Sequence, residues 1–337
     1  MPARALIAGL SGPELTDGER RFFREADPWG FILFRRNVRD REQLRRLTGS
    51  LRETVGRQAP VLVDQEGGRV QRLAPPLWPA YPPGRAYGQV PSRSGQREAA
   101  WLGARLIAHD LREAGIDVNC LPVLDVPAPG AHDVIGDRAY GETPETVSRL
   151  GRAAAEGLLA GGVAPVIKHI PGHGRAGVDS HLALPVVGAS LAELEACDFA
   201  PFRALADMPM AMTAHVVYTA VDPEQPATTS ARVIGEIVRG SIGFDGLLMS
   251  DDLSMQALQG DLGSRARRAF AAGCDVALHC NGDMAEMQAI AAEAPLLAGR
   301  ALARAESALG RVLRQPEPLD VAAARARLAE LLAAPAA

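Results

Sequence analysis

Residues 164–181 read Ala-Pro-Val-Ile-Lys168-His-Ile-Pro-Gly-His-Gly-Arg-Ala-Gly-Val-Asp-Ser-His181. The first four residues form an apolar run of strand length, and the next fourteen contain three histidines, a lysine and an aspartate. A packed core avoids ionisable groups unless each is paired, and glycine and proline favour a loop over a helix or strand interior. The stretch therefore predicts a buried strand that ends in a polar, chemically active loop.

The same pattern recurs along the chain. Residues 246–249 are apolar, and Ser250, Asp251 and Asp252 follow them directly. Eight apolar segments of strand length end in this way, with polar or glycine-rich residues: 5–10, 30–34, 60–63, 118–123, 164–167, 210–214, 246–249 and 275–278.

The segments between these strands have a helical period. Apolar residues recur every three or four positions in residues 44–55 and 104–114, the spacing of a helix that packs one face on a sheet. Thr143 and Ser190 each stand before an acidic residue, as helix N-caps do.

Eight β/α alternations predict a single (β/α)8 TIM barrel over residues 1–337, closed by helices from about residue 297. A doubly wound sheet is the alternative, but Gly9-Leu-Ser-Gly12 is not its dinucleotide-binding fingerprint. Catalytic groups of a TIM barrel lie at the carboxyl ends of its strands. Such positions hold Asp64, Glu66, Arg69, Asp125, Lys168, His169, His215, Asp251, Asp252 and His279.

Composition narrows the class of protein. The net charge is −4 and the 36 basic residues are scattered, so we expect no nucleic-acid partner. No export signal or membrane-length apolar run is visible, and we expect a cytoplasmic enzyme with a small-molecule substrate and no obligate protein partner. Four widely spaced cysteines fit reduced thiols: Cys120, Cys197, Cys274 and Cys280.

Three motifs resemble those of the family 3 glycoside hydrolases, and within them the bacterial β-N-acetylglucosaminidases (β-hexosaminidases) of cell-wall recycling. They are Lys168-His-Ile-Pro-Gly-His-Gly174 with Asp179-Ser-His181, residues 63–72 (Val-Asp-Gln-Glu-Gly-Gly-Arg-Val-Gln-Arg), and residues 250–255 (Ser-Asp-Asp-Leu-Ser-Met). The resemblance spans nearly the whole chain. Two mild departures, Ile170 in place of Phe and Gly136-Asp-Arg-Ala139 in place of Gly-Glu-Arg-Ser, affect only the fine shape of the sugar pocket.

The resemblance implies a TIM barrel and a retaining mechanism with no cofactor and no metal. Asp251 would be the nucleophile, and His181, oriented by Asp179, would be the general acid/base. The implied substrate is a peptidoglycan fragment such as GlcNAc-1,6-anhydroMurNAc-peptide, which loses its terminal non-reducing β-N-acetylglucosamine. The resemblance assigns sugar binding to Asp64, Arg138, Lys168 and His169; Arg69 is a further candidate hydrogen-bond donor to the sugar hydroxyls.

The physical chemistry of a histidine suits this role. Retaining glycosidases normally use two carboxyl groups, one as nucleophile and one to shuttle the proton. An imidazole with an ordinary pKa of about 6.5 can donate to the leaving oxygen and then deprotonate water near neutral pH. Asp179 could hold one ring nitrogen and favour the imidazolium, as in a catalytic triad.

Several of these residues also have a structural interpretation. Asp252 could cap or orient the chain, and His173 could hydrogen-bond the loop backbone. His215 and His279 could be buried, satisfied histidines. Glu66 could form a scaffold pair with Arg69.

Rival functions remain open at this point. His169, His173, Asp179 and His181 could bind Zn²⁺ in a metal-dependent hydrolase, although that leaves the Asp251-Asp252 strand end without a role. A sugar-binding barrel without catalysis is disfavoured, because the candidate nucleophile, acid/base and orienting residue are all present. The further alternatives are another family 3 β-glycosidase specificity and transfer to phosphate in place of water.

Overall fold

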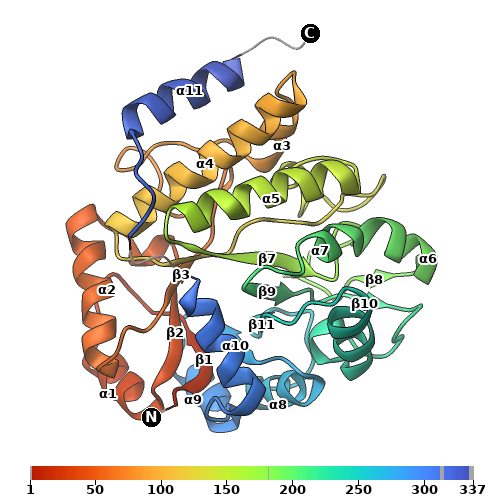
Figure 1. Ribbon diagram of the computed structural model, residues 1–337. Coiled ribbons are helices and arrows are strands. Elements are labelled where there is room, and N and C mark those ends of the chain that lie inside the picture. Colours follow the sequence, from red (N-terminus) through yellow and green to blue (C-terminus); the bar gives the residue numbers. More distant parts are fainter. Residues whose placement is uncertain (1, 181, 312–314, 334–337) are drawn as a thin grey trace.

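A computed structural model of the chain describes residues 2–180, 182–311 and 315–333 (Figure 1). Eight parallel strands close into a barrel in chain order, and the last strand pairs with the first. The predicted (β/α)8 barrel is confirmed, and a barrel strand overlaps each of the eight predicted segments. The barrel strands are β1 (Arg4–Ala8), β2 (Pro28–Leu33), β3 (Val61–Val63), β6 (Val118–Asn119), β7 (Ala164–Ile170), β9 (Met210–Thr213), β11 (Leu247–Asp252) and β12 (Val276–His279).

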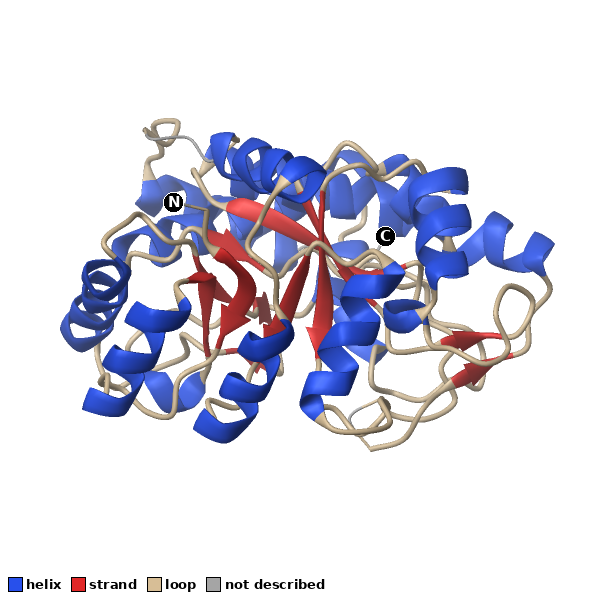
Figure 2. Ribbon diagram, turned by 90° about the horizontal axis from the view of Figure 1, so that it is seen from below, coloured by secondary structure: helices blue, strands red, loops and turns tan. Residues whose placement is uncertain are grey.

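Helices surround the strands, as the view from below makes clear (Figure 2). Thr143 and Ser190 are helix N-caps, as predicted, because each side chain accepts a backbone N–H three residues ahead. The helices and helical turns are α1 (Asp17–Ala26), η1 (Arg35–Asn37), α2 (Arg41–Val55), α3 (Gly84–Gly88), α4 (Arg93–Glu113), η2 (Gly136–Arg138), α5 (Pro144–Ala160), α6 (Leu191–Glu193), η3 (Leu194–Asp198), α7 (Ala200–Ala204), η4 (Ala227–Thr229), η5 (Val233–Ser241), α8 (Leu262–Ala272), α9 (Met284–Glu293), α10 (Gly299–Gly310) and α11 (Val321–Ala333).

The core has two layers because successive side chains of a strand point to opposite faces. In β1, Ala5 and Ile7 belong to the cluster inside the barrel, whereas Leu6 and Ala8 pack outward against the helices. The inner layer includes Ile32, Leu62, Val118, Val166, Met212, Met249 and Leu278. The residue two positions after each inner side chain therefore faces the barrel interior again.

Two short additions flank the barrel. An antiparallel hairpin, β4 (Gln65–Gly67) and β5 (Val70–Gln71), follows β3. Gly67 has φ +96°, and a Cβ there would lie 2.2 Å from the carbonyl oxygen of Pro82, so this tight turn requires glycine. A parallel pair, β8 (Val186–Val187) and β10 (Val217–Tyr218), lies in the loops after β7 and β9.

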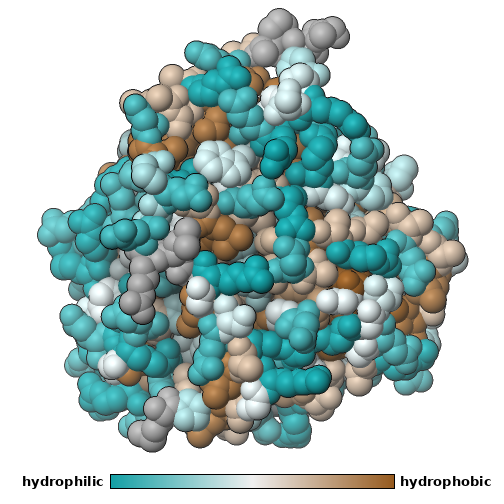
Figure 3. Space-filling model, viewed as in Figure 1, coloured by the Kyte–Doolittle hydropathy of each residue, from teal (hydrophilic) through white to brown (hydrophobic). Residues whose placement is uncertain are grey.

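One face of the molecule is largely polar (Figure 3). On the face seen in Figure 3, apolar residues lie in small separate groups among hydrophilic ones. Helix α11 packs along α4, outside the ring of barrel helices (Figure 1). Over the described residues, no helix combines the length and the apolar character needed to span a membrane.

Candidate active site

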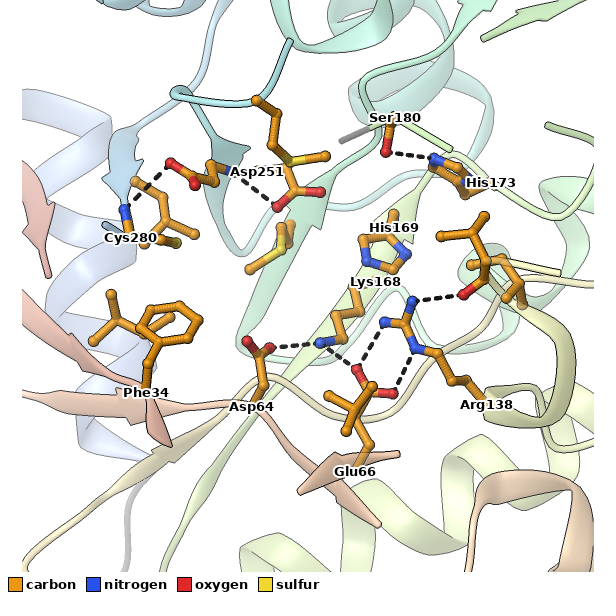
Figure 4. Close-up of a pocket in the computed structure, with 18 of the residues that line it drawn as sticks. Phe34, Asp64, Glu66, Arg138, Lys168, His169, His173, Ser180, Asp251 and Cys280 are labelled. Carbon is orange, nitrogen blue, oxygen red and sulfur yellow. Dashed lines mark hydrogen bonds and ion pairs between the residues drawn. The ribbon is translucent and has the colours of Figure 1, made fainter. Parts of the chain in front are cut away.

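A pocket of about 750 Å³, including its open mouth, lies at the carboxyl ends of the strands (Figure 4). Strand alternation explains its lining. Lys168 follows the inner residue Val166 by two positions, and Asp251 follows Met249 in the same way. The same spacing brings Phe34, Asp64 and Cys280 into the pocket from other strands.

A chain of alternating charges forms the floor of the pocket (Figure 4). Lys168 Nζ lies 2.8 Å from Asp64 Oδ1 and 2.7 Å from Glu66 Oε1. Arg138 donates from Nε and Nη2 to the two oxygens of Glu66, both at 2.8 Å. Arg72 donates to Asp64 Oδ2 at 3.2 Å. Each buried charge therefore has an opposite neighbour, the condition under which such charges are tolerated.

The pairing fixes the protonation of both carboxyl groups. Burial by itself would raise the pKa of Asp64, but Lys168 and Arg72 hold it well below its usual value. Burial likewise opposes ionisation of Glu66, and Arg138 and Lys168 outweigh it, lowering its pKa to about 2. Both groups are carboxylates at neutral pH and can accept hydrogen bonds from sugar hydroxyls, but neither can serve as a general acid.

Lys168 is the only lysine in the chain, whereas arginine supplies the other basic residues. Its side chain is 2 % exposed, and the charges of Asp64 and Glu66 outweigh burial and raise the pKa of its ammonium. An ammonium is a compact charge with three donors, whereas a guanidinium is a broad planar fork. Two of these donors are engaged by Asp64 and Glu66, which leaves one for a ligand.

A buried aspartate orients the histidine next to Lys168. Asp125 Oδ2 lies 2.7 Å from His169 Nδ1, and its Oδ1 accepts the backbone N–H groups of His169 and His173 at 3.2 and 2.6 Å. Burial favours the neutral acid, but His169 and these hydrogen bonds lower the pKa of Asp125. Since the carboxylate accepts a hydrogen bond from Nδ1–H, His169 has Nε2 to offer a ligand.

Asp251 and Asp252 end β11 in different environments. Both residues line the pocket, and Asp251 Oδ1 accepts the backbone N–H of Asp252 at 2.8 Å. The carboxylate of Asp252 accepts the hydroxyl and backbone N–H of Ser254, at 2.7 and 3.0 Å, and the N–H of Cys280 at 3.2 Å. Asp252 thus ties β11 to the end of β12, which agrees with the orienting interpretation of its side chain.

The loop after β7 carries the predicted acid/base pair. His181 lies outside the described residues. Asp179 is partly buried, and its carbonyl accepts the N–H groups of Leu182 and Ala183 at 2.9 and 3.0 Å. The hydroxyl of buried Ser180 lies 3.1 Å from His173 Nε2, and the carbonyl of Ser180 accepts the backbone N–H of Ala257. Ser180 therefore joins this loop to the one after β11.

Two sequence-based assignments need correction. Glu66 does not pair with Arg69, because β4 directs Glu66 into the barrel mouth toward Lys168 and Arg138. The Arg69 side chain is 44 % exposed and forms an ion pair with Asp137 at 3.1 Å. It also donates to the carbonyls of Asp133, Val134 and Ile135, and it is not among the described residues that line the pocket. Arg69 therefore braces the loop that carries Arg138.

His279 is buried as considered, but only its Nε2 is satisfied, because no described residue hydrogen-bonds its Nδ1. It follows the inner residue Leu278 by one position and so points outward, where its Nε2 lies 2.9 Å from Glu286 on α9. Among the described residues, the one group of three with ligand atoms close enough for a metal is His109, Asp110 and Glu113 on α4. His169 and His173 are not part of it, and the zinc hypothesis of the sequence includes His181, which is not described.

Sequence reasoning gave no ligand-orienting role to Asp125, and it gave Glu66 the wrong partner. Both stand just after predicted strands, so the available signal was a carboxylate at a strand end. Their partners are 44 and 72 residues away in the chain, and no local pattern identifies such pairs.

Known proteins with this architecture are similar over most of the chain. A β-hexosaminidase of Alkalilimnicola ehrlichii is 43 % identical over 287 residues, which cover 82 % of this chain and 80 % of that protein. A β-hexosaminidase of Bordetella avium is 39 % identical over 287 residues, covering 83 % and 81 %. The crystal structure of NagZ from Neisseria gonorrhoeae, in complex with N-trifluoroacetyl-D-glucosamine, has a TM-score of 0.89, 36 % identity and 99 % coverage of both chains.

The family model described as the glycosyl hydrolase family 3 N-terminal domain matches residues 20–315. The resemblance found in the sequence motifs, to this family and within it to the bacterial β-hexosaminidases, is confirmed. A family model over most of the chain, relatives near 40 % identity and the closed barrel agree: this chain belongs to glycosyl hydrolase family 3 and is a glycoside hydrolase.

Proposed function

We propose that this protein is a retaining exo-β-N-acetylglucosaminidase that removes terminal β-linked N-acetylglucosamine from peptidoglycan fragments. The relatives named β-hexosaminidase support the sugar class. The similar NagZ crystallised with an N-acylated glucosamine, a sugar of the same kind. Asp64, Lys168, Arg138 and His169 bind the sugar hydroxyls, because together they offer both donors and acceptors at the pocket floor.

In this mechanism Asp251 attacks the anomeric carbon and forms a covalent glycosyl-enzyme, which water then hydrolyses. Its position at the inner carboxyl end of β11, in the same pocket as Lys168, supports this role. The N–H of Asp252 holds one carboxylate oxygen and orients the group. His181 donates the proton to the leaving oxygen and later removes one from water, with Asp179 as its orienting partner.

One observation carries this assignment. Asp64 and Glu66 remain ionised because their cationic partners lower the pKa values of both carboxyls. The carboxylate oxygens of Asp252 accept hydrogen bonds from Ser254 and Cys280. Asp64 and Glu66 are thus poor proton donors, and the Asp252 carboxylate is engaged by the protein, which favours a histidine for that task.

The surroundings of Phe34, which lines the pocket, suit an anionic leaving group. The Phe34 ring lies 5.1 Å from the guanidinium of Arg36 and 5.2 Å from that of Arg72. Burial lowers the pKa of Arg36, and the guanidinium remains charged near neutral pH. The aromatic ring of Phe34 can contact a second sugar ring, and the nearby Arg36 guanidinium attracts carboxylates such as those of a muropeptide.

The test is a panel of p-nitrophenyl β-glycosides, each assayed with and without phosphate, together with a GlcNAc-anhydroMurNAc-peptide. We expect the β-N-acetylglucosaminide to be cleaved faster than the β-glucoside, and the β-anomer of the free sugar to appear first by NMR. We also expect no sugar phosphate and unchanged activity after dialysis against EDTA. Faster cleavage of the β-glucoside would contradict the sugar assignment, phosphate transfer would contradict hydrolysis, and loss of activity in EDTA would revive the zinc hypothesis.

A further inference from the structure

Strand β11 leaves its regular pairing just before Asp251. Its ladder with β9 runs from Leu247 to Met249 and goes no further. On the other side, its register with β12 shifts between Met249 and Asp252. Irregularities of this kind re-aim a side chain, so another interaction has to fix the direction of Asp251.

Where the backbone ladder stops, three buried side chains form a hydrogen-bonded chain that contacts the end of the strand. Thr213 ends β9, His215 stands two residues later, and Thr228 lies in the η4 turn. All three are fully buried. The N–H of Asp251 donates to Thr213 Oγ1 at 3.3 Å, and the carbonyl of Asp252 lies 3.0 Å from His215 Nε2.

Thr228 connects these two contacts. Its hydroxyl oxygen lies 2.7 Å from Thr213 Oγ1 and 2.7 Å from His215 Nδ1. The hydrogen bonds run from the backbone N–H of Asp251 through the three side chains to the backbone carbonyl of Asp252. Because Asp251 and Asp252 are adjacent in the chain, these hydrogen bonds close into one ring.

The proton positions in this ring follow from the groups at its ends. A carbonyl only accepts, so His215 Nε2 carries a proton. Burial lowers the pKa of His215, which keeps the imidazole neutral and leaves Nδ1 as an acceptor. Thr228 therefore donates to Nδ1, in preference to the carbonyl of Ala214 at 3.2 Å, and Thr213 donates to Thr228. Every hydrogen bond in the ring points the same way.

We propose that Thr213, Thr228 and His215 are positioning residues that aim Asp251 at the anomeric carbon. The inference rests on the proposed role of Asp251 as nucleophile. The Asp251 carboxylate hydrogen-bonds the N–H of Asp252, and the ring holds both the peptide before Asp251 and the residue that supplies this N–H. Loosening the ring misplaces the attacking oxygen but leaves the sugar-binding charges at Asp64 and Lys168 intact.

The test compares Thr228→Val, which keeps the shape but removes the hydroxyl, with Thr228→Ser, which keeps the hydroxyl. Thr229→Val is the matched control, because Thr229 lies in the same turn and its hydroxyl contacts Gln225 at 3.1 Å, outside the ring. A 5-fluoro-N-acetylglucosaminyl fluoride separates binding of the sugar (KI) from attack on it (ki). We expect ki to fall about tenfold or more in Thr228→Val with KI nearly unchanged, since small misplacements of a reacting group are costly.

Thr228→Ser should recover most of ki, and Thr229→Val should retain it. An unchanged ki in a folded Thr228→Val protein, or an equal loss in Thr228→Ser, would overturn the inference. If Thr228→Val does not fold, Thr213→Val and Thr213→Ser give the same comparison at the next hydroxyl. Wild-type protein that is not labelled on Asp251 would instead refute the proposed nucleophile, so the two failures are distinguishable.

Discussion

Lys168 Nζ lies 2.8 Å from Asp64 Oδ1 and joins β7 to the residue after β3, two strands that β6 separates in the barrel. This ion pair belongs both to the scaffold of the barrel and to the candidate active site. It closes the barrel mouth with opposite charges, and it presents both groups to the pocket. A ligand that binds there meets groups whose protonation is already fixed.

Removing the cation from this pair should destabilise the fold. Lys168→Met leaves two buried carboxylates, Asp64 and Glu66, without their shared partner, and we expect a loss of about 3–5 kcal/mol in the free energy of unfolding. Urea titration measures it. Arg93→Met is the control, because its ion pair with Glu145 is exposed, with side chains 71 % and 68 % accessible, and should change stability by at most about 1 kcal/mol. Equal losses in the free energy of unfolding would mean that the buried ion pair stabilises the fold no more than the exposed one.

The proposed nucleophile is testable by covalent trapping. We expect the 5-fluoro glycosyl fluoride to leave an ester on the peptide that contains Asp251, found by mass mapping. Asp252→Asn should still be labelled on Asp251, because the Asp252 carboxylate contacts the protein backbone. A protein that turns over but is never labelled would point to attack by the acetamido group of the substrate.

The proposed acid/base pair is testable because the activity lost in its variants should depend on the leaving group of the substrate. Asp179→Asn and His181→Ala should lose activity together, by about 10²–10⁴-fold on the natural disaccharide and far less on a dinitrophenyl glycoside. Dinitrophenolate leaves with little protonation. The leaving oxygen of the disaccharide is more basic, so only its departure depends on the proton donor. Measurements of kcat/KM on both substrates decide the matter, and an equal loss on both would remove His181 from the acid role.

Two arginines that look equivalent in the sequence should behave differently. Arg138 lines the pocket and binds Glu66 with two hydrogen bonds, so Arg138→Ala should raise KM for the aminosugar about tenfold or more. Arg69 is half-exposed and contacts the loop from outside the pocket, so Arg69→Ala should raise KM no more than about threefold. The reverse order would mean that Arg69 reaches the substrate.

Stability should fall as the pH drops from 7 toward 4, and His173 should contribute to the fall. Burial, helped by neighbouring His169, lowers the pKa of His173 to about 4, whereas the unfolded chain has the ordinary value near 6.5. Between these two values the unfolded state binds more protons. The stabilisation from neutral His173 is therefore complete above about pH 6.5 and is lost as the pH falls through this window.

His173→Gln should flatten the pH dependence measured by urea unfolding at several pH values. His132→Gln is the control, because that histidine is exposed and loses little water on folding. A slope that does not change in His173→Gln would show that His173 is protonated alike in the folded and unfolded chain.

The sequence predicted the barrel because its signals are local. A strand such as 164–167 or 246–249 is visible as a short apolar run, and a helix such as α2 as an apolar period, within a few residues. The family followed from continuous motifs for the same reason. Placement of Asp251 and Lys168 on one rim also needed only the rule that parallel strands end at a common edge.

The partners of each charged group could not be predicted in this way. Glu66 lies three residues from Arg69 and 72 from Arg138, yet its ion pair is with Arg138. The difference arises because β4 turns Glu66 inward, whereas Arg69 stands outside the pocket against the loop of Asp137. Asp125 and His169 are similarly distant in sequence and meet inside the closed barrel.

The sequence by itself determined the fold, the family and the set of reactive residue types, since these depend on short-range patterns of apolar and polar side chains. Only the tertiary structure decided which carboxylates are held ionised and which histidine nitrogen faces the pocket. It alone also decided how Thr213, Thr228 and His215 enclose the strand end at Asp251. These properties depend on burial and on contacts between distant segments, which exist only once eight strands have closed around a common interior.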